Sequence, residues 1–317
     1  MAEEKRKLPI TSAFGATFRR IRKREPFASP PMSELAERMF EALVAAALAK
    51  CVDFNIAVNR ARKHTDEEFV FVSALRGICE DLIALAYFSK LPVENRREIT
   101  KLLINQTVTD GLEVQRAFFK ANNPFQPVLT SSMAEGMQSP SPKLAARHAL
   151  RAFWAAQGVK RKDGPTIKDM ASEVGLTFTY DYIYFVSSNF VHFNPQALLR
   201  MGWGDMEKPF EFSVSHISGY YKSLASFYGA ILFIGYHSAF SCSQFRTSCE
   251  REIARLLELI EEVHRWPEVI TFEEMNQNPP VYLLTHAMRG AFPENGAPEG
   301  ILAEVRGLGK RLNSGRT

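Results

Sequence analysis

A nearly uncharged stretch, residues 69–88, constrains the fold more than any other part of this sequence. Its charged residues are Arg76, Glu80 and Asp81. All the others are apolar, small or weakly polar. A helix that is apolar on nearly all sides is buried, so we expect this one at the centre of the molecule. Helical spacing gathers its core-facing residues on one side, namely Val72, Leu75, Cys79, Leu82, Ile83 and Ala86.

Arg76 and Glu80 lie one helical turn apart at the edge of this apolar face, whereas Asp81 points away from it. A buried guanidinium or carboxylate is costly unless it is paired or bound to another group. The pair is therefore the first candidate for a functional site.

Helical periodicity continues through most of the chain and predicts an all-α fold, a multi-helix bundle around the buried central helix. Local signals set some of the limits: Ser33 as a helix cap, a capping box from Thr65 to Glu68, and Gly175 after a short helix that begins at Ile167. Further helices are expected over residues 33–60, 94–120, 144–156, 167–174, 215–240, 248–265 and 302–312.

Proline-rich and polar segments divide the chain into three predicted parts. These are a basic, irregular N-terminal arm (1–31), a helical domain (32–265) and a Pro-rich C-terminal tail with one short helix (266–317). Within the domain, residues 122–143 predict a long loop or lid, and residues 194–211 an irregular segment.

The N-terminal arm carries a basic run that is a candidate nucleic-acid contact. We favour a solvated or disordered arm, because few aromatic side chains that could stack on bases are interleaved with the basic ones. The basic residues are Arg19, Arg20, Arg22, Lys23 and Arg24.

Net charge, cysteine spacing and the N-terminal sequence indicate the kind of partner and the cellular compartment to expect. The formal net charge of +4 favours an anionic partner only weakly. The four cysteines show no CxxC spacing, which indicates reduced thiols and a cytoplasmic location. The charged N-terminus lacks an apolar core, so no signal peptide is expected.

Residues 223–240 carry no formal charge and are just long enough to raise the alternative of a membrane span. Their serines, tyrosines and histidine weaken that alternative, and we expect a buried helix and no membrane association.

Several common catalytic classes are excluded by missing motifs. The sequence has no GxxxxGK[ST] or GxGxxG loop, no HExxH, no Cys/His zinc spacing and no GxSxG elbow. A nucleoside triphosphatase, a dinucleotide oxidoreductase and a zinc hydrolase are therefore not expected, and neither is a metal or an organic cofactor.

The segment 177–195 is rich in aromatic and β-branched residues, which would also suit a strand. Helical spacing explains it better, because Tyr180, Tyr184, Ser188 and His192 then share one face. If this helix packs on the central one, these four residues meet Arg76 and Glu80. We call the six residues the polar seam.

The polar seam has two interpretations. In one, Arg76 neutralises a phosphate or other anion, Glu80 orients Arg76, and His192 moves protons. Tyr180, Tyr184, Ser188 and the adjacent Asn189 are then the ligand-binding candidates. In the other, the seam is a structural network in which the same groups satisfy one another and buried carbonyls.

These residues resemble a bacterial family numbered 5677 among the domains of unknown function. The resemblance rests on Leu75-Arg76-x-x-x-Glu80, Met170-Ala-x-Glu-Val-Gly-Leu, Tyr180-x-x-x-Tyr184-x-x-Ser187-Ser188 and Val191-His192-Phe-Asn-Pro195, and covers about residues 35–240. It implies an all-helical fold in which Arg76, Glu80, Tyr184, Ser188 and His192 hold the polar positions of the family pattern.

A looser resemblance is to the HEPN superfamily of helical ribonucleases and toxins, which place an Arg and a His a few residues apart on one helix. This sequence departs from that pattern, because no Arg precedes His192 on its helix and Arg76 would have to supply the guanidinium. Arg60 and His64 come near the required spacing but lie one residue short.

Two functions follow as expectations. The first is a helical module that binds an anionic ligand, such as a nucleotide or RNA, or a protein partner, through the polar seam. The second is a metal-independent ribonuclease or toxin using His192 and Arg76, with phage defence as one setting. A homodimer is also expected, because helical domains often bury an apolar face at a two-fold axis.

Overall fold

The computed structural model of the chain shows an all-α protein, as the sequence predicts. No β-strand occurs in the part of the chain that it describes. That part consists of residues 10–25, 27–28, 30–60, 68–123, 125, 142–192, 194–199, 201, 212–213, 215–240, 249–263, 265–269 and 300–314.

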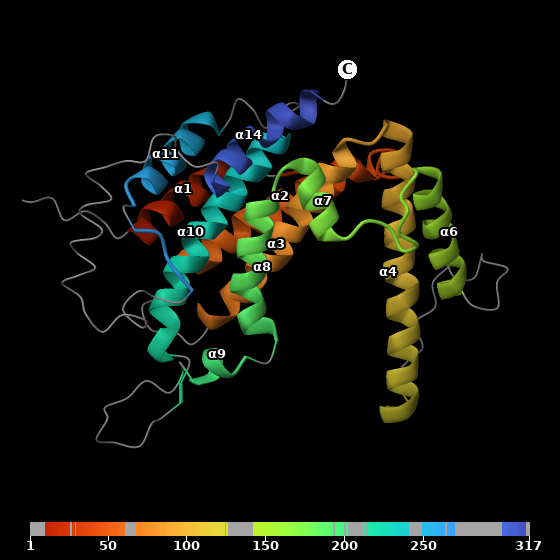
Figure 1. Cartoon of the computed structure of the whole chain (residues 1–317), viewed down its shortest axis with the longest axis horizontal. Helices are drawn as coiled ribbons and strands as arrows, with labels where there is room; N and C mark the ends of the chain where they lie inside the picture. The colour runs from red at the N-terminus through yellow and green to blue at the C-terminus, as the bar shows by residue number, and fades with distance from the viewer. Residues whose placement is uncertain are drawn as a thin grey trace, which may run out of the picture.

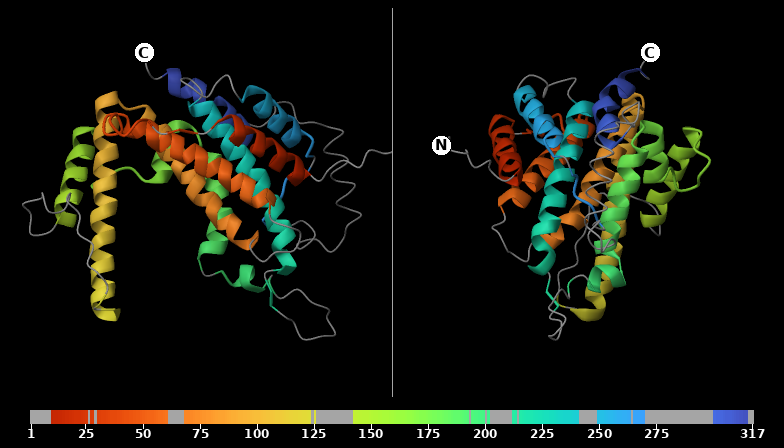
Figure 2. Two further views of the ribbon diagram at one scale, coloured as in Figure 1. Left: turned by 180° about the vertical axis from the view of Figure 1, so that it is seen from behind. Right: turned by 60° about the vertical axis from the view of Figure 1, so that its left-hand side comes forward.

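The described helices form a main bundle with one helix pair beside it (Figures 1 and 2). The pair consists of α4 and α6, which pack along each other. The helices in chain order are α1 (Ile10–Arg24), α2 (Met39–Arg60), α3 (Glu68–Ser89), α4 (Val93–Asn122), α6 (Pro142–Ala156), α7 (Ile167–Val174), α8 (Thr177–Val191), α9 (Pro195–Leu199), α10 (Ser215–Phe240), α11 (Glu250–Glu261) and α14 (Ile301–Ser314).

The buried central helix is α3, and it contacts α2, α7, α8 and α10. Its predicted apolar face is fully buried at Val72, Leu75, Leu82 and Ile83. Because polar side chains are sparse along its length, α3 can be covered on several sides at little desolvation cost. The prediction of a central buried helix is confirmed.

Helix α10 covers a long side of α3 and is itself buried from residue 224 to residue 236. It is joined to its neighbours by specific polar contacts. Tyr236 donates a hydrogen bond to the Ile78 carbonyl of α3 at 2.9 Å, and Asn55 of α2 donates one to the Gly229 carbonyl at 3.1 Å. Of the helices in the described ranges, none has the length and apolar character needed to cross a membrane.

Residues 10–24 differ from the solvated arm that the sequence predicts, because they form helix α1 and enter the core. Phe14, Phe18 and Ile21 are fully buried, and the Phe18 ring meets the Phe233 ring of α10 edge-on at 5.3 Å. These three residues share a helical face that the neighbouring basic run obscures in the sequence. Helix α1 packs on α2, α10 and α11.

Helix α14 is also part of the core, whereas the sequence predicts a loosely structured tail with one short helix. Val305, Leu308 and Leu312 are buried, and α14 packs mainly on α10. The two helices approach closely at Gly309, where an added Cβ would overlap the backbone carbonyl of Ser238. The Ser238 hydroxyl also accepts a hydrogen bond from the Gly309 N–H at 3.0 Å.

Two predicted helix starts have different outcomes. Ser33 does not cap α2, because residues 32–38 form hydrogen-bonded turns and the helix begins at Met39. The predicted capping residue Thr65 lies outside the described residues, which resume at Glu68.

Helix α7 has the limits that the sequence predicts. Thr166 and Asp169 form a capping box, and Gly175 ends the helix with φ of 71°. These signals act within a few residues of one another, so they identify the helix without tertiary information.

Helix α8 confirms helix over strand for residues 177–191, but it ends before His192. His192 has an extended backbone, and its N–H donates to the Ser188 carbonyl at 3.0 Å. The segment after it is less irregular than predicted, because Pro195 begins the short helix α9. Proline is well suited to the first position of a helix, and the Asn194 side chain accepts from the Ala197 N–H at 3.2 Å.

Candidate functional site

Packing of α8 on α3 assembles most of the polar seam (Figure 1). Arg76 and Glu80 project from α3, and Tyr180, Tyr184 and His192 come from α8 and its end. Arg76 and His192 are 116 positions apart in the sequence, yet their side chains meet.

Arg76 is the hub of the seam. Its Nε donates to Glu80 Oε1 at 2.7 Å, and its guanidinium carbon lies 4.5 Å from the centre of the Tyr184 ring. Its Nη1 lies 3.5 Å from His192 Nε2. The hydrogen bond that Arg76 donates to Glu80 raises the pKa of Arg76 further, so the guanidinium carries its positive charge at every physiological pH.

The seam is open to solvent, which differs from the buried pair that the apolar helix predicts. The Arg76 and Glu80 side chains are 27% and 31% exposed, and His192 is exposed as well. A partly exposed pair one turn apart on a helix contributes only about 0.3–0.5 kcal/mol to stability. Stability alone therefore gives little reason for this arrangement.

The other residues of the polar seam contribute two neighbouring aromatic rings and one hydroxyl that has no hydrogen-bond partner among the described residues. The Tyr180 and Tyr184 rings lie 5.4 Å apart, and partial burial, followed by the nearby Glu80 carboxylate, raises the pKa of Tyr180. The Ser188 Oγ is buried and has no hydrogen-bond partner among the described residues. Its neighbour Ser187 is turned inward and donates to the Ile183 carbonyl at 2.6 Å.

Asn189, predicted as a ligand-binding residue, is engaged elsewhere. Its Oδ1 accepts a hydrogen bond from the Asn194 side chain at 2.6 Å. Because Asn194 also caps α9, this bond ties the last turn of α8 to the segment that follows. The geometry gives Asn189 a structural contact next to the seam.

The basic run of α1 is divided between structural pairs and free surface. Arg22 pairs with Asp53 at 3.3 Å, and Arg24 pairs at 3.1 Å with Glu252, whose side chain is only 6% exposed. The other members, Arg19, Arg20 and Lys23, are exposed. Helix α10 lies between α1 and α8 in Figure 1 and in the right-hand view of Figure 2, so the run and the seam are separate surfaces.

Chemically, the seam can hold an anion. The Tyr184 ring and Glu80 fix the guanidinium, which leaves Nη2 without a hydrogen-bond partner among the described residues. The His192 imidazole adds a second nitrogen on the same side. A guanidinium is a rigid donor for phosphate or carboxylate, and an imidazole can both donate a hydrogen bond and transfer a proton.

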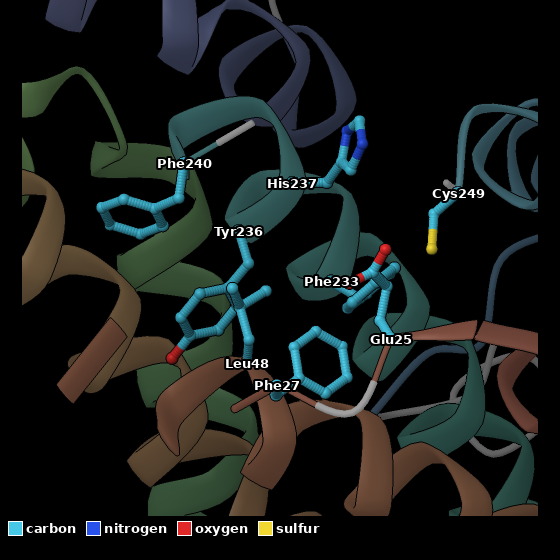
Figure 3. Close-up of a pocket in the computed structure, with 8 residues that line it drawn as sticks. All are labelled: Glu25, Phe27, Leu48, Phe233, Tyr236, His237, Phe240 and Cys249. Carbon is cyan, nitrogen blue, oxygen red and sulfur yellow. The ribbon is translucent and has the colours of Figure 1, made fainter. Parts of the chain in front are cut away.

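A small cavity elsewhere in the bundle is too small for a ligand of this kind. It lies between α2, α10 and the residues after α1, and its volume of about 10 Å³ is the least that can hold one water molecule. Figure 3 shows the Tyr236 hydroxyl pointing away from His237, toward α3. The sequence gives no signal for this cavity.

Sequence reasoning also misses a larger cleft beside α4, α6 and α7. One local signal could have indicated it. Arg147, Leu150, Arg151 and Trp154 follow the i, i+3, i+4, i+7 spacing of one helical face and combine two cations with an indole.

The fold and the seam define a helical protein with an open Arg–His–Tyr site between two packed helices. Residues 71–209 match the model of a family of unknown function, DUF5677. This match confirms the resemblance over those residues, and it spans every member of the polar seam. No curated protein and no solved structure matches the chain significantly. The looser HEPN resemblance, the homodimer and the role in phage defence stay predictions.

Proposed function

We propose that the polar seam binds a phosphate group, carried by a nucleotide or by RNA. The observation that carries the proposal is the approach of Arg76 Nη1 to His192 Nε2 at 3.5 Å on an exposed surface. Two nitrogen groups that can both donate to one anion lie side by side, and an aromatic ring supports the guanidinium from one face.

The exposed members of the basic run would add to binding if the ligand is RNA. Arg19, Arg20 and Lys23 are surface cations that can neutralise backbone phosphates, and each such contact steepens the dependence of affinity on salt. Helix α10 lies between the two surfaces, so we expect a mononucleotide bound at the seam to leave the basic run without a phosphate contact. Short and long ligands therefore distinguish the two sources of phosphate.

The test is a binding titration of the full chain with a mononucleotide and with a labelled single-stranded oligoribonucleotide. We expect Arg76→Gln and His192→Gln each to weaken binding by about tenfold, because each removes a charge-assisted contact. The matched control is Arg255→Gln, which removes an exposed arginine that pairs with Glu258 at 2.9 Å on α11. Equal affinities for all four proteins would refute the proposal.

A second candidate, a metal-independent ribonuclease, is favoured by the position of His192. The His192 imidazole is exposed and lies next to the Arg76 guanidinium. In this position the imidazole could act as a general acid or base while the guanidinium stabilises a charged phosphorane. Glu80 would hold Arg76 in place for that step. Such an activity would suit a toxin or a phage-defence effector.

Cleavage of labelled RNA in the presence of EDTA tests this candidate. We expect the wild-type chain to cut and His192→Ala not to cut. Cleavage by neither protein, or equal cleavage by both, would refute the ribonuclease while leaving the binding titration to decide the first proposal.

A further inference from the structure

A second cleft lies where α4, α6 and α7 meet the end of α3, and nothing in the polar seam contributes to it. Its volume of about 370 Å³ is within the usual range of small-molecule sites, which is about 300–1,000 Å³. Along α3, the seam residue Glu80 and the cleft residue Phe88 are eight positions apart, or about 12 Å.

The floor of the cleft is apolar and firmly held. Trp154 is 3% exposed, and its ring stacks on the Phe88 ring at 6.4 Å and meets the Phe153 ring edge-on at 5.1 Å. The loop after α6 presses on the indole, since a Cβ added at Gly164 would overlap Trp154. Leu150 and Met170 complete this floor, which suits the body of an apolar or aromatic ligand.

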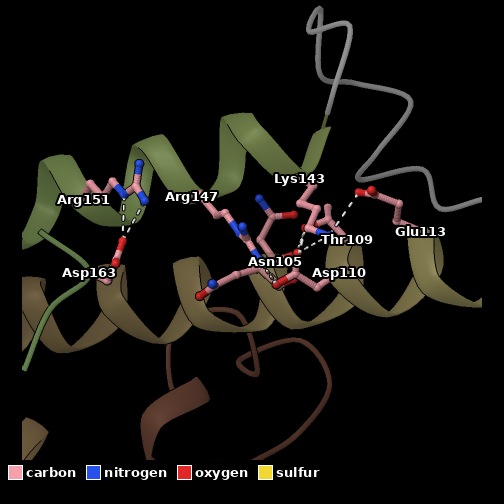
Figure 4. A network of polar contacts seen from close by, with 9 residues as sticks. Asn105, Thr109, Asp110, Glu113, Lys143, Arg147, Arg151 and Asp163 are labelled. Carbon is pink, nitrogen blue, oxygen red and sulfur yellow. Dashed lines mark hydrogen bonds and ion pairs between the residues drawn. The ribbon is translucent and has the colours of Figure 1, made fainter. Parts of the chain in front are cut away.

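The mouth of the cleft is cationic. Arg151 donates from Nε and Nη2 to the same oxygen of Asp163, at 2.9 and 2.8 Å (Figure 4). Arg147 reaches Asp110 of α4 only at 3.6 Å. The Arg151 guanidinium, with smaller contributions from Lys162 and Arg147, holds the pKa of Asp163 below its usual value. Of the charged residues that line the cleft, two are arginines, Arg147 and Arg151, and one is the carboxylate Asp163.

We infer that this cleft binds a small organic anion, with an apolar or aromatic body on the Trp154 floor and a negatively charged head between Arg147 and Arg151. The Asp163 carboxylate holds the position of that head when the ligand is absent. Its side chain is 73% exposed, so it can leave Arg151 without crossing the protein interior. Gln106, on α4, offers an amide at the same cleft for a polar substituent.

If the ligand displaces Asp163 from Arg151, its affinity depends on the charge of both residues, which the affinity of a purely hydrophobic ligand does not. Removing an arginine weakens binding of the anion, whereas removing the competing carboxylate strengthens it. Arg151 and Asp163 are paired with each other, yet neutralising one or the other should change the affinity for the same ligand in opposite directions.

The probe is anilinonaphthalene sulfonate, titrated into the full chain and followed by its fluorescence. We expect Arg151→Gln to weaken binding by about tenfold, as the loss of one charge-assisted contact would. Asp163→Asn should tighten binding by at least about threefold, because the ligand no longer competes with an ion pair. The control Arg255→Gln, on the distant α11, should leave the affinity within about twofold.

A matched ligand tests the head group. Phenylnaphthylamine has the same ring system without the sulfonate, and we expect it to bind more weakly and to respond to neither Arg151→Gln nor Asp163→Asn. Circular dichroism spectra of the variants check that each one is folded. Unchanged or weaker binding of the sulfonate to Asp163→Asn, or equal binding of the neutral analogue, would overturn the inference.

Discussion

Glu304 offers a direct test of how α14 is built into the fold. This residue, in the first turn of α14, reaches across to the start of α8. Its carboxylate accepts hydrogen bonds from the Phe178 N–H at 3.0 Å, from the Thr179 N–H at 2.8 Å and from the Thr179 hydroxyl at 2.7 Å. Helix α8 has no capping side chain of its own, since Leu176 occupies the N-cap position.

The size of the effect follows from these contacts. An N-cap contact is worth about 1 kcal/mol, and a negative charge at a helix N-terminus adds about 0.3–1 kcal/mol. A third hydrogen bond to the charged group and its partial burial raise the total. We expect Glu304→Ala to lower the free energy of unfolding by about 2–3 kcal/mol, and Glu304→Gln, which keeps an acceptor, by about 1 kcal/mol.

Urea denaturation followed by circular dichroism measures this loss in the full chain. The control is Glu258→Ala, which removes an exposed glutamate paired with Arg255 at 2.9 Å and should cost less than about 0.5 kcal/mol. If Glu304→Ala costs no more than the control, α14 does not cap α8. A separate early transition for α14 would also contradict its place in the common core.

Three further predictions concern packing, the seam and the thiols. Gly309→Ala should cost about 1–3 kcal/mol of unfolding free energy, because α14 has to move away from Ser238. Arg76→Ala should cost about 1 kcal/mol or less, since its ion pair and ring contact are partly exposed; a loss above about 3 kcal/mol in the same urea assay would favour the structural-network interpretation. Burial raises the pKa of the Cys51 and Cys79 thiols far above their usual values, so both should resist maleimide in the native chain and react after unfolding. Below about pH 8.5, the usual pKa of cysteine, both thiols are protonated whether the chain is folded or unfolded, and the folded state keeps its full stability. Above that pH the thiols ionise only in the unfolded chain, so each should lower the free energy of unfolding by about 1.4 kcal/mol per pH unit. Urea titrations at increasing pH would show this loss.

Local signals in the sequence predict those parts of the fold that depend on neighbouring residues. The limits of α7 follow from Thr166, Asp169 and Gly175, which act on one another within ten residues. The helical spacing of Tyr180, Tyr184 and His192 likewise predicts the shared face of the seam, and only the last turn differs, because the helix ends at Val191. These predictions need no information about distant segments.

Other features have no local signal. The core face of α1 consists of three apolar residues beside a strongly basic run. The charge pattern alone predicts that this segment is exposed to solvent, not buried. The cap that Glu304 provides for α8 joins residues 125 positions apart. The openness of the seam depends on how α8 is positioned against α3, which periodicity along one helix does not define.

Helices from both sides of the sequence cover α3, and this has a consequence for the segment that matches the family model. The matched segment 71–209 holds most of α3 but not α2 or α10, which cover much of its apolar surface. The matched segment by itself therefore leaves the sides of α3 that face α2 and α10 without cover. A fragment limited to residues 71–209 would expose this apolar surface to water, so the helices outside the match are needed to keep α3 buried.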